Sequence, residues 1–252
     1  MTNESEADAA RALIACLDLT NLNDDCTEID IAALCERAET RQGRVAAICI
    51  WPRFVPQARS LAPDLRIATV VNFPHGSDDP ARTAADAAAA LADGADEIDM
   101  VIDYRRLAES PGHVGRQVRT VKEAVGAKLL KAILETGELQ APHRITQAAQ
   151  EALSGGADFL KTSTGKTARH ASLDAAAIML QAIAAAGGTT GFKASGGIRT
   201  FEDARAYRDL AESVCGSAWA GPDRFRIGAS AVLGDLLAVA AGTARATHRE
   251  TY

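Results

Sequence analysis

Lysine is scarce in this 252-residue chain, although cationic residues are not. Only six of the 27 Lys and Arg residues are lysines, and all six lie between positions 122 and 193. Arginine keeps its proton in proteins, whereas a buried lysine can lose its proton and become a nucleophile. Because the chain otherwise uses arginine for its cations, each lysine marks a position where an amine could be required.

Several other features that define common protein classes are missing. The net charge is −6 and no run of basic residues is present, which excludes a nucleic-acid-binding surface. No apolar run approaches the ~18 residues of a membrane span, so no membrane partner is expected. The first ten residues are acidic and polar, unlike a secretory signal, which predicts a soluble, cytoplasmic protein.

Metal-binding patterns are absent from the sequence too. The five cysteines include no Cys-x-x-Cys pair, and the five histidines include no His-Glu-x-x-His motif. Lone cysteines usually act as small core residues. We therefore expect no metal site.

Short apolar runs rich in β-branched residues alternate with segments of helical periodicity. The predicted strands are residues 14–19, 45–50, 66–71, 97–102, 128–134, 158–162, 190–195 and 225–228. The predicted helices include residues 29–38, 80–92, 143–153, 174–185 and 201–212. Eight strands alternating with helices imply a parallel sheet, either closed as a barrel or open and doubly wound.

Polar side chains at the strand ends favour the closed form. Barrel enzymes draw catalytic groups from many strand ends, whereas an open sheet binds its ligand at one switch point. The polar residues at or near the ends of different strands are Asp18, Asn72, Asp99, Lys161, Lys193 and Ser230. The sequence therefore predicts one α/β domain over residues 1–252, a (β/α)8 TIM barrel with a short N-terminal helix.

The alternation of side chains along a strand gives the predicted charges a direction. Ile98, Met100 and Ile102 form an apolar face for the outer helices, so Glu97 and Asp99 point into the lumen. The same rule sends three lysines inward, namely Lys131, Lys161 and Lys193. Two cations ~5 Å apart repel by roughly 3 kcal/mol, about two pKa units, which could leave one lysine as a neutral nucleophile. A satisfied layer of ion pairs is the alternative.

Glycines follow three predicted strands where a barrel commonly binds phosphate. They are Gly165, Gly196, Gly197 and Gly228, the last close to Ser230. Backbone N–H groups in glycine turns and at helix N-termini suit a phosphate dianion. The sequence therefore predicts a phosphate site at this end of the barrel.

Eight long segments spread over nearly the whole chain form motifs rarely shared between families. They are LDLTNLNDD (17–25), AAICIWPRFV (46–55), IATVVNFPHG (67–76), ADEIDMV (95–101), LLKAILETGEL (129–139), ADFLKTSTGK (157–166), GFKASGGIRT (191–200) and RIGAS (226–230). In these segments the chain resembles the bacterial class I deoxyribose-phosphate aldolases. The resemblance implies reversible cleavage of 2-deoxy-D-ribose 5-phosphate to acetaldehyde and D-glyceraldehyde 3-phosphate in deoxyribose phosphate catabolism, without metal or organic cofactor.

The resemblance also implies roles for individual residues. Lys161 would form the imine, Lys193 would lower the pKa of Lys161 and move protons, and Asp99 would be the acid/base partner. Some family members end in a tyrosine that protonates the enamine, which makes Tyr252 a candidate. The residues expected to bind substrate or phosphate are Asp18, Thr20, Gly165, Lys166, Gly196, Gly197, Gly228 and Ser230. The family commonly forms dimers, so we expect a homodimer.

Two positions depart from the family pattern. Ala231 stands where a second serine often follows Ser230, so one hydrogen bond to phosphate would be missing or supplied by the backbone. Asp103 places a carboxylate after EIDMV to which we assign no role. Neither departure affects the three expected catalytic positions.

Two other functions remain compatible with the residues. One is another Schiff-base aldolase, of the transaldolase or deoxyphosphogluconate type, that acts on a different phosphorylated carbonyl compound. The other is a regulator that binds a sugar phosphate and uses its lysines as counter-charges. In each case Lys122 and Lys128 are expected at the surface or at a strand edge.

Overall fold

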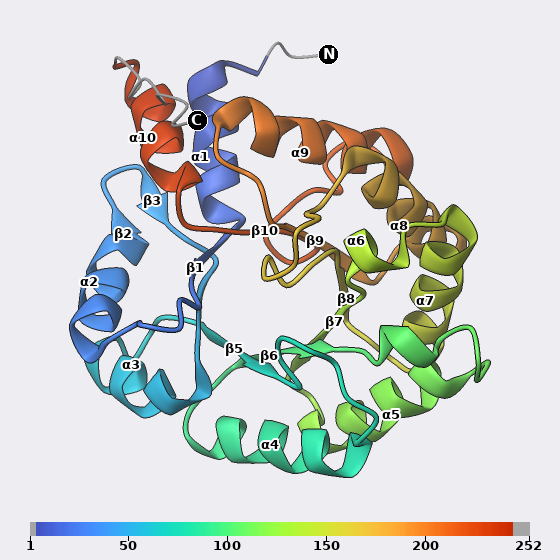
Figure 1. Cartoon of the computed structure of the whole chain (residues 1–252). Coiled ribbons are helices and arrows are strands. Elements are labelled where there is room, and N and C mark those ends of the chain that lie inside the picture. Colours follow the sequence, from blue (N-terminus) through green and yellow to red (C-terminus); the bar gives the residue numbers. More distant parts are fainter. Residues whose placement is uncertain (1–3, 244–252) are drawn as a thin grey trace.

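A closed barrel of eight parallel strands lies inside a ring of helices in the computed structural model, which describes residues 4–243 (Figure 1). The strands pair in the order β1-β10-β9-β8-β7-β6-β5-β4, and β4 pairs with β1 to close the barrel. They are β1 (Leu17–Asn21), β4 (Ala47–Ile50), β5 (Ile67–Val71), β6 (Glu97–Val101), β7 (Leu129–Ile133), β8 (Phe159–Lys161), β9 (Gly191–Ser195) and β10 (Phe225–Ala229). The predicted (β/α)8 TIM barrel is confirmed.

Each barrel strand is followed in the chain by a helix of the outer ring. These helices are α2 (Glu28–Ala38), α3 (Val55–Leu61), α4 (Pro80–Ala92), α5 (His113–Val125), α7 (Pro142–Ser154), α8 (Leu173–Ala185), α9 (Phe201–Cys215) and α10 (Val232–Ala241). The remaining elements are α1 (Glu6–Ala15), β2 (Glu39–Thr40), β3 (Gly43–Arg44), η1 (Pro52–Phe54), η2 (Tyr104–Arg106) and α6 (Thr136–Leu139). Helices α1 and α10 pack side by side, so the first and last described helices meet (Figure 1).

Local side-chain chemistry fixes several helix starts. Thr27 and Thr200 each form a capping box with the aspartate three residues later, Asp30 and Asp203. Such a box satisfies two backbone N–H groups that the first helical turn leaves free. The predicted helices 29–38 and 201–212 therefore begin within one residue of the observed ones.

The first predicted strand, residues 14–19, was wrong at its start. Ile14 belongs to helix α1, and the strand begins at Leu17. Both elements bury apolar side chains here, among them Leu13 and Ile14 of the helix. The apolar run consequently crosses the junction without a break, and it could not reveal where the helix ends.

The two faces of each strand have different environments. The outward side chains of Ile98, Met100 and Phe192 are fully buried against the helices. Inside, at the N-terminal end of the lumen, the Phe159 ring takes the space next to Gly191, where a Cβ atom would lie 2.4 Å from the ring. Within residues 4–243, no helix is both long and apolar enough to cross a membrane.

Candidate active site

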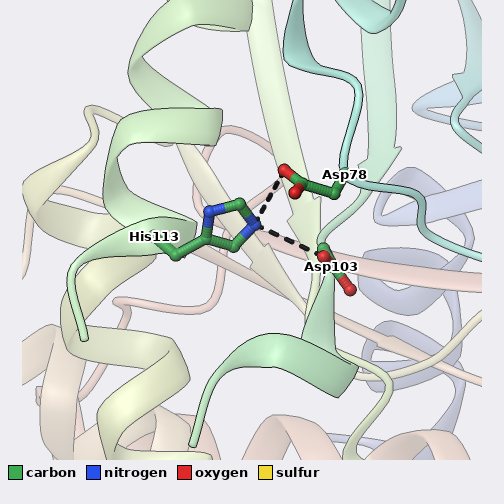
Figure 2. A group of neighbouring side chains, drawn as sticks. All are labelled: Asp78, Asp103 and His113. Atoms are coloured by element: carbon green, nitrogen blue, oxygen red, sulfur yellow. Dashed lines mark ion pairs between the residues drawn. The ribbon is translucent and has the colours of Figure 1, made fainter. Parts of the chain in front are cut away.

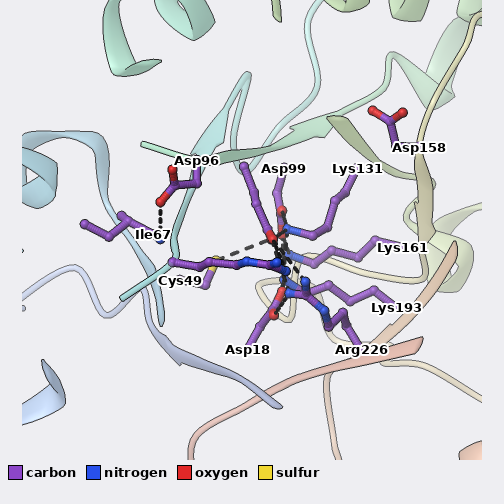
Figure 3. Close-up of polar contacts among 12 residues, drawn as sticks. Asp18, Cys49, Ile67, Asp96, Asp99, Lys131, Asp158, Lys161, Lys193 and Arg226 are labelled. Atoms are coloured by element: carbon purple, nitrogen blue, oxygen red, sulfur yellow. Dashed lines mark hydrogen bonds and ion pairs between the residues drawn. The ribbon is translucent and has the colours of Figure 1, made fainter. Parts of the chain in front are cut away.

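Asp99 on β6 binds the amines of three lysines that project from the next three strands (Figure 3). Its Oδ1 atom lies 2.8 Å from Lys131 Nζ, and its Oδ2 atom lies 2.8 Å from both Lys161 Nζ and Lys193 Nζ. Lys161 and Lys193 are direct register partners on β8 and β9, which places their side chains next to each other. The inward direction predicted for these side chains is observed.

A second set of ion pairs lies against this cluster. Arg226 on β10 binds Asp18 Oδ1 at 2.6 Å and Glu97 Oε1 at 3.0 Å. Lys131 also contacts Glu97 Oε2 at 2.5 Å, and Lys193 contacts Asp18 Oδ2 at 2.5 Å. All of these side chains are at most 2% exposed, so water screens them little.

The charges inside the lumen do not balance if every group is ionised. Among residues 4–243, four cationic side chains, Lys131, Lys161, Lys193 and Arg226, share the lumen with three carboxylates, Asp18, Glu97 and Asp99. An uncompensated buried charge is costly, so the balanced state has one neutral lysine.

The contacts identify which lysine is neutral. Lys161 pairs with one carboxylate, Asp99, whereas Lys131 pairs with three and Lys193 with two. Arg226, with two carboxylate partners, keeps its proton. Lys161 is therefore the amine that loses its proton most easily.

The directions of the pKa shifts also distinguish Lys161 from Lys131 and Lys193, because only the pKa of Lys161 is lowered. Burial and then the neighbouring Lys193 cation lower the pKa of Lys161, and Asp99 only partly offsets them. Burial also acts against the charged form of Lys193, but Asp18 and Asp99 outweigh it and raise its pKa. The lysine cations hold the pKa of Asp99 well below its usual value despite its burial. The site thus combines an amine that loses its proton readily, on Lys161, with a protonated lysine, Lys193, and an ionised carboxylate, Asp99.

A cavity of about 460 Å³ opens above Lys161 at the C-terminal ends of the strands. Its wall includes Lys161 and seven of the eight residues predicted to bind substrate or phosphate, namely Thr20, Gly165, Lys166, Gly196, Gly197, Gly228 and Ser230. Gly228 also provides space for the amine layer, because a Cβ atom there would lie 2.9 Å from Lys193 Cε. A larger hollow of about 750 Å³ lies at the opposite end of the barrel, where Lys131, Lys161 and Lys193 do not line it, and we do not assign the site to it.

Four predicted site residues are not part of the cavity wall as described. Asp18 does not line the cavity, because it is fully buried below it and acts there as a counter-ion for Lys193 and Arg226. Asp99 and Lys193 are likewise buried beneath the cavity and reach it through Lys161. Tyr252 lies outside the described residues.

Two residues of this region, Arg226 and Arg199, were not predicted from the sequence. Arg226 is the fourth cation of the lumen, and it lies between outward-facing Phe225 and Ile227, so the alternation rule could have revealed it. Arg199 lines the cavity two residues after the Gly196-Gly197 pair, and an arginine this close to a predicted phosphate turn could have been identified from the sequence.

Lys122, Lys128 and Asp103 each lie close to a side chain that can carry the opposite charge. Lys122 pairs with Asp158 at 2.6 Å and Lys128 with Asp96 at 3.0 Å, and the lysines sit away from the lumen, as expected. Asp103 lies 3.3 Å from His113 Nε2, which is 3.2 Å from Asp78 (Figure 2).

Of the residues described, Asp78, Asp103 and His113 form the one group with donor atoms close enough to hold a metal ion. Asp78 is also paired with Arg106, and His113 lies between the two carboxylates. His113 Nε2 is buried and forms no hydrogen bond with either carboxylate, and the cluster brings together the loops that follow β5 and β6.

Together, the barrel fold and the lysine site define a barrel aldolase. A family model described as DeoC/LacD family aldolase matches residues 12–232, and the chain belongs to this family. A deoxyribose-phosphate aldolase from Agrobacterium fabrum is 53% identical over 240 residues, 93% of each chain.

Solved structures agree with this assignment. A crystal structure assigned as a deoxyribose-phosphate aldolase from Toxoplasma gondii ME49 has a TM-score of 0.86 at 30% identity, covering 95% of this chain and 98% of that one. A tetrameric deoxyribose phosphate aldolase from Aeropyrum pernix has a TM-score of 0.74 at 27% identity, covering 93% and 92%.

Proposed function

We propose that this protein is a Schiff-base aldolase that reversibly cleaves 2-deoxy-D-ribose 5-phosphate to acetaldehyde and D-glyceraldehyde 3-phosphate, in deoxyribose phosphate catabolism. The observation that carries the proposal is the position of Lys161 at the cavity of the glycine turns, where its buried amine has one carboxylate partner among residues 4–243. The 53% identity to the deoxyribose-phosphate aldolase of Agrobacterium fabrum supports the choice of substrate.

The reaction begins with the neutral amine of Lys161. Its Nζ atom adds to C1 of the open-chain sugar, the nitrogen loses a proton, and the former carbonyl oxygen gains one. Loss of water from this carbinolamine leaves an iminium ion on Lys161. Asp99, 2.8 Å from Nζ, orients the amine and accepts a proton from it.

The iminium ion at C1 then withdraws electrons from the C2–C3 bond of the sugar. The C2–C3 bond breaks, its electron pair forms the enamine at C1 and C2, and the C3 hydroxyl loses its proton to become the aldehyde of glyceraldehyde 3-phosphate. Protonation of C2 and hydrolysis of the iminium release acetaldehyde and restore Lys161. Asp99 and Lys193, joined by a 2.8 Å hydrogen bond, exchange these protons with water.

The glycine turns and Lys166 hold the phosphate in this proposal. Gly165, Gly196 and Gly197 adopt positive φ angles of 77°, 92° and 81°, which glycine tolerates without strain. Turns of this kind can direct successive N–H groups toward an anion. Helix α10 starts directly after Ala231, so a backbone N–H group can replace the hydroxyl of the missing serine.

Tyr252, in this proposal, protonates C2 of the enamine. A Tyr252→Phe variant should then lower kcat and slow the exchange of acetaldehyde methyl hydrogens with deuterated water, which NMR can follow. Unchanged exchange would contradict this role.

The proposed reaction needs no metal ion or organic cofactor, because the iminium nitrogen takes up the electron pair. Activity that survives exhaustive treatment with EDTA is the expected result. We further propose a cytoplasmic homodimer, which light scattering on the purified protein and cell fractionation can test.

A substrate panel tests the proposed function. Purified protein should release acetaldehyde from 2-deoxy-D-ribose 5-phosphate, and it should condense acetaldehyde with glyceraldehyde 3-phosphate. Activity with dihydroxyacetone phosphate or pyruvate as donor, and none with acetaldehyde, would assign another Schiff-base aldolase. Binding of the sugar phosphate without turnover would indicate a regulator.

A further inference from the structure

Glu135 is a buried carboxylate that the proposed mechanism does not use. It directly follows the apolar stretch after β7, its side chain is completely buried, and its backbone has a φ angle of +54°. Within residues 4–243 it forms no ion pair, and burial raises its pKa. A buried carboxylate and a positive φ angle at a residue other than glycine both cost free energy. We therefore expect Glu135 to have a role that offsets this cost.

All side-chain hydrogen bonds of Glu135 go to the segment after β8. Thr164 donates its hydroxyl to Oε2 at 2.6 Å, and its backbone N–H lies 3.3 Å from the same oxygen. The Thr167 hydroxyl donates to the Arg169 carbonyl oxygen at 3.0 Å and lies 3.5 Å from Oε1. The carboxylate therefore holds the start of the Thr164–Thr167 turn and lies close to its end.

This turn carries two residues of the cavity wall. The backbone N–H of Lys166 donates to Thr164 Oγ1 at 3.0 Å, so a chain of hydrogen bonds runs from Lys166 through Thr164 to Glu135. A Cβ atom on Gly165 would lie 3.9 Å from Gly196 Cα, so the turn touches the glycine pair that follows β9. Glu135 thus holds the turn after β8 next to the glycine pair after β9, and these two segments form the predicted phosphate pocket.

A second contact joins the same two loops. A Cβ atom on Gly137 would lie 2.4 Å from the carbonyl oxygen of Arg169, so α6 packs closely on the far end of the loop after β8. The short helix and the carboxylate therefore support the phosphate turn from one side.

We propose that Glu135 is a positioning residue for phosphate recognition, which acts through Thr164 on the Gly165–Lys166 turn. The inference rests on the proposed function, because it assigns the phosphate group of that substrate to this turn. It separates two tasks within the cavity: Lys161 reacts with the aldehyde, and Glu135 holds the Gly165–Lys166 turn in position for the phosphate.

The test compares a phosphorylated with an unphosphorylated substrate. In Glu135→Ala, KM for 2-deoxy-D-ribose 5-phosphate should rise about ten- to a hundredfold, the worth of one or two hydrogen bonds to a carboxylate. The kcat/KM for 2-deoxy-D-ribose should change less than about threefold, since that substrate lacks the phosphate. Equal losses with both substrates would contradict the inference.

Four further variants test whether the effect is specific to this path or a general effect on folding. Glu135→Gln retains an acceptor for the Thr164 hydroxyl and should recover most of the lost affinity, and Thr164→Val should reproduce the KM increase of Glu135→Ala. Glu138→Ala removes an exposed carboxylate three residues away and should leave both substrates unaffected. The double variant Glu135→Ala/Thr164→Val should be no weaker than either single variant, and additive losses would contradict a shared path.

The proposed function and this inference fail in different ways. Wild-type protein without activity on 2-deoxy-D-ribose 5-phosphate would overturn the function. An active wild type whose Glu135→Ala variant keeps its KM, with circular dichroism showing a folded protein, would overturn only the inference.

Discussion

Lys161 Nζ lies 2.8 Å from Asp99 Oδ2, and Asp99 is the one carboxylate with which it pairs in the described part of the chain. Asp99 divides its two oxygens among three amines, so its charge compensates Lys161 only in part. A site with one surplus buried cation releases a proton from the least compensated amine. This relationship explains why Lys161, and not its neighbours, is the proposed nucleophile.

The Lys193 cation is predicted to lower the pKa of Lys161. Replacing it in Lys193→Met removes that repulsion and leaves Asp99 and Asp18 with one cation fewer, so the pKa of Lys161 should rise. Because the amine reacts only when neutral, the rising limb of the pH–rate profile should move roughly one to two pH units upward. Lys122→Met, at a lysine outside the lumen, is the control, and an unmoved limb in Lys193→Met would refute the electrostatic account.

Asp99→Asn should have the opposite effect on Lys161. Loss of the carboxylate removes the group that raises the pKa of this amine, so the amine is deprotonated at lower pH. Turnover should nevertheless fall by about 10²- to 10⁴-fold, because proton transfer loses its relay group. Steady-state kinetics over pH measures both effects, and a variant with near-normal kcat would show that Asp99 carries no proton.

Arg226 is predicted to stabilise the fold without touching the substrate. Arg226→Met leaves Asp18 and Glu97 short of a buried partner, and the free energy of unfolding should fall by about 3–5 kcal/mol at neutral pH. Adding Glu97→Gln removes one of the stranded carboxylates and should recover part of the loss. Urea unfolding measures these free energies. A loss below about 1 kcal/mol would mean that the ion pairs of Arg226 contribute little to the stability of the fold.

Lys166 is predicted to bind the phosphate group. It lines the cavity and pairs with Asp24, an exposed carboxylate that a phosphate dianion can replace. Lys166→Met should raise KM for the phosphorylated sugar about tenfold with little change in kcat. Lys128→Met, which removes another half-exposed lysine paired with an aspartate, should leave KM unchanged. Equal effects of both substitutions would point to general charge attraction.

Much of this site follows from the two-residue alternation of strand side chains. The rule places Glu97, Asp99 and the three lumen lysines correctly, because each lies in a short strand next to at least one buried apolar residue that faces outward. The positions of the phosphate glycines also follow from the order of the strands. The same rule applied to the last strand would have included Arg226.

Other features depend on contacts that no local pattern reveals. Glu135 lies in a left-handed turn outside any strand, and its burial arises from the packing of the loop after β8 upon it. Asp18 sits near a strand end in the sequence, but pairing with Arg226 and Lys193 holds it below the cavity. Both positions follow from how separate loops and strands meet in the closed barrel.

Borohydride reduction in the presence of acetaldehyde, followed by peptide mapping, tests the central claim most directly. The reagent should fix a two-carbon adduct on Lys161 alone, and Lys161→Arg should abolish both the adduct and turnover, because arginine keeps the charge without a nucleophilic amine. An adduct on Lys131 or Lys193, or no adduct in an active enzyme, would contradict the account.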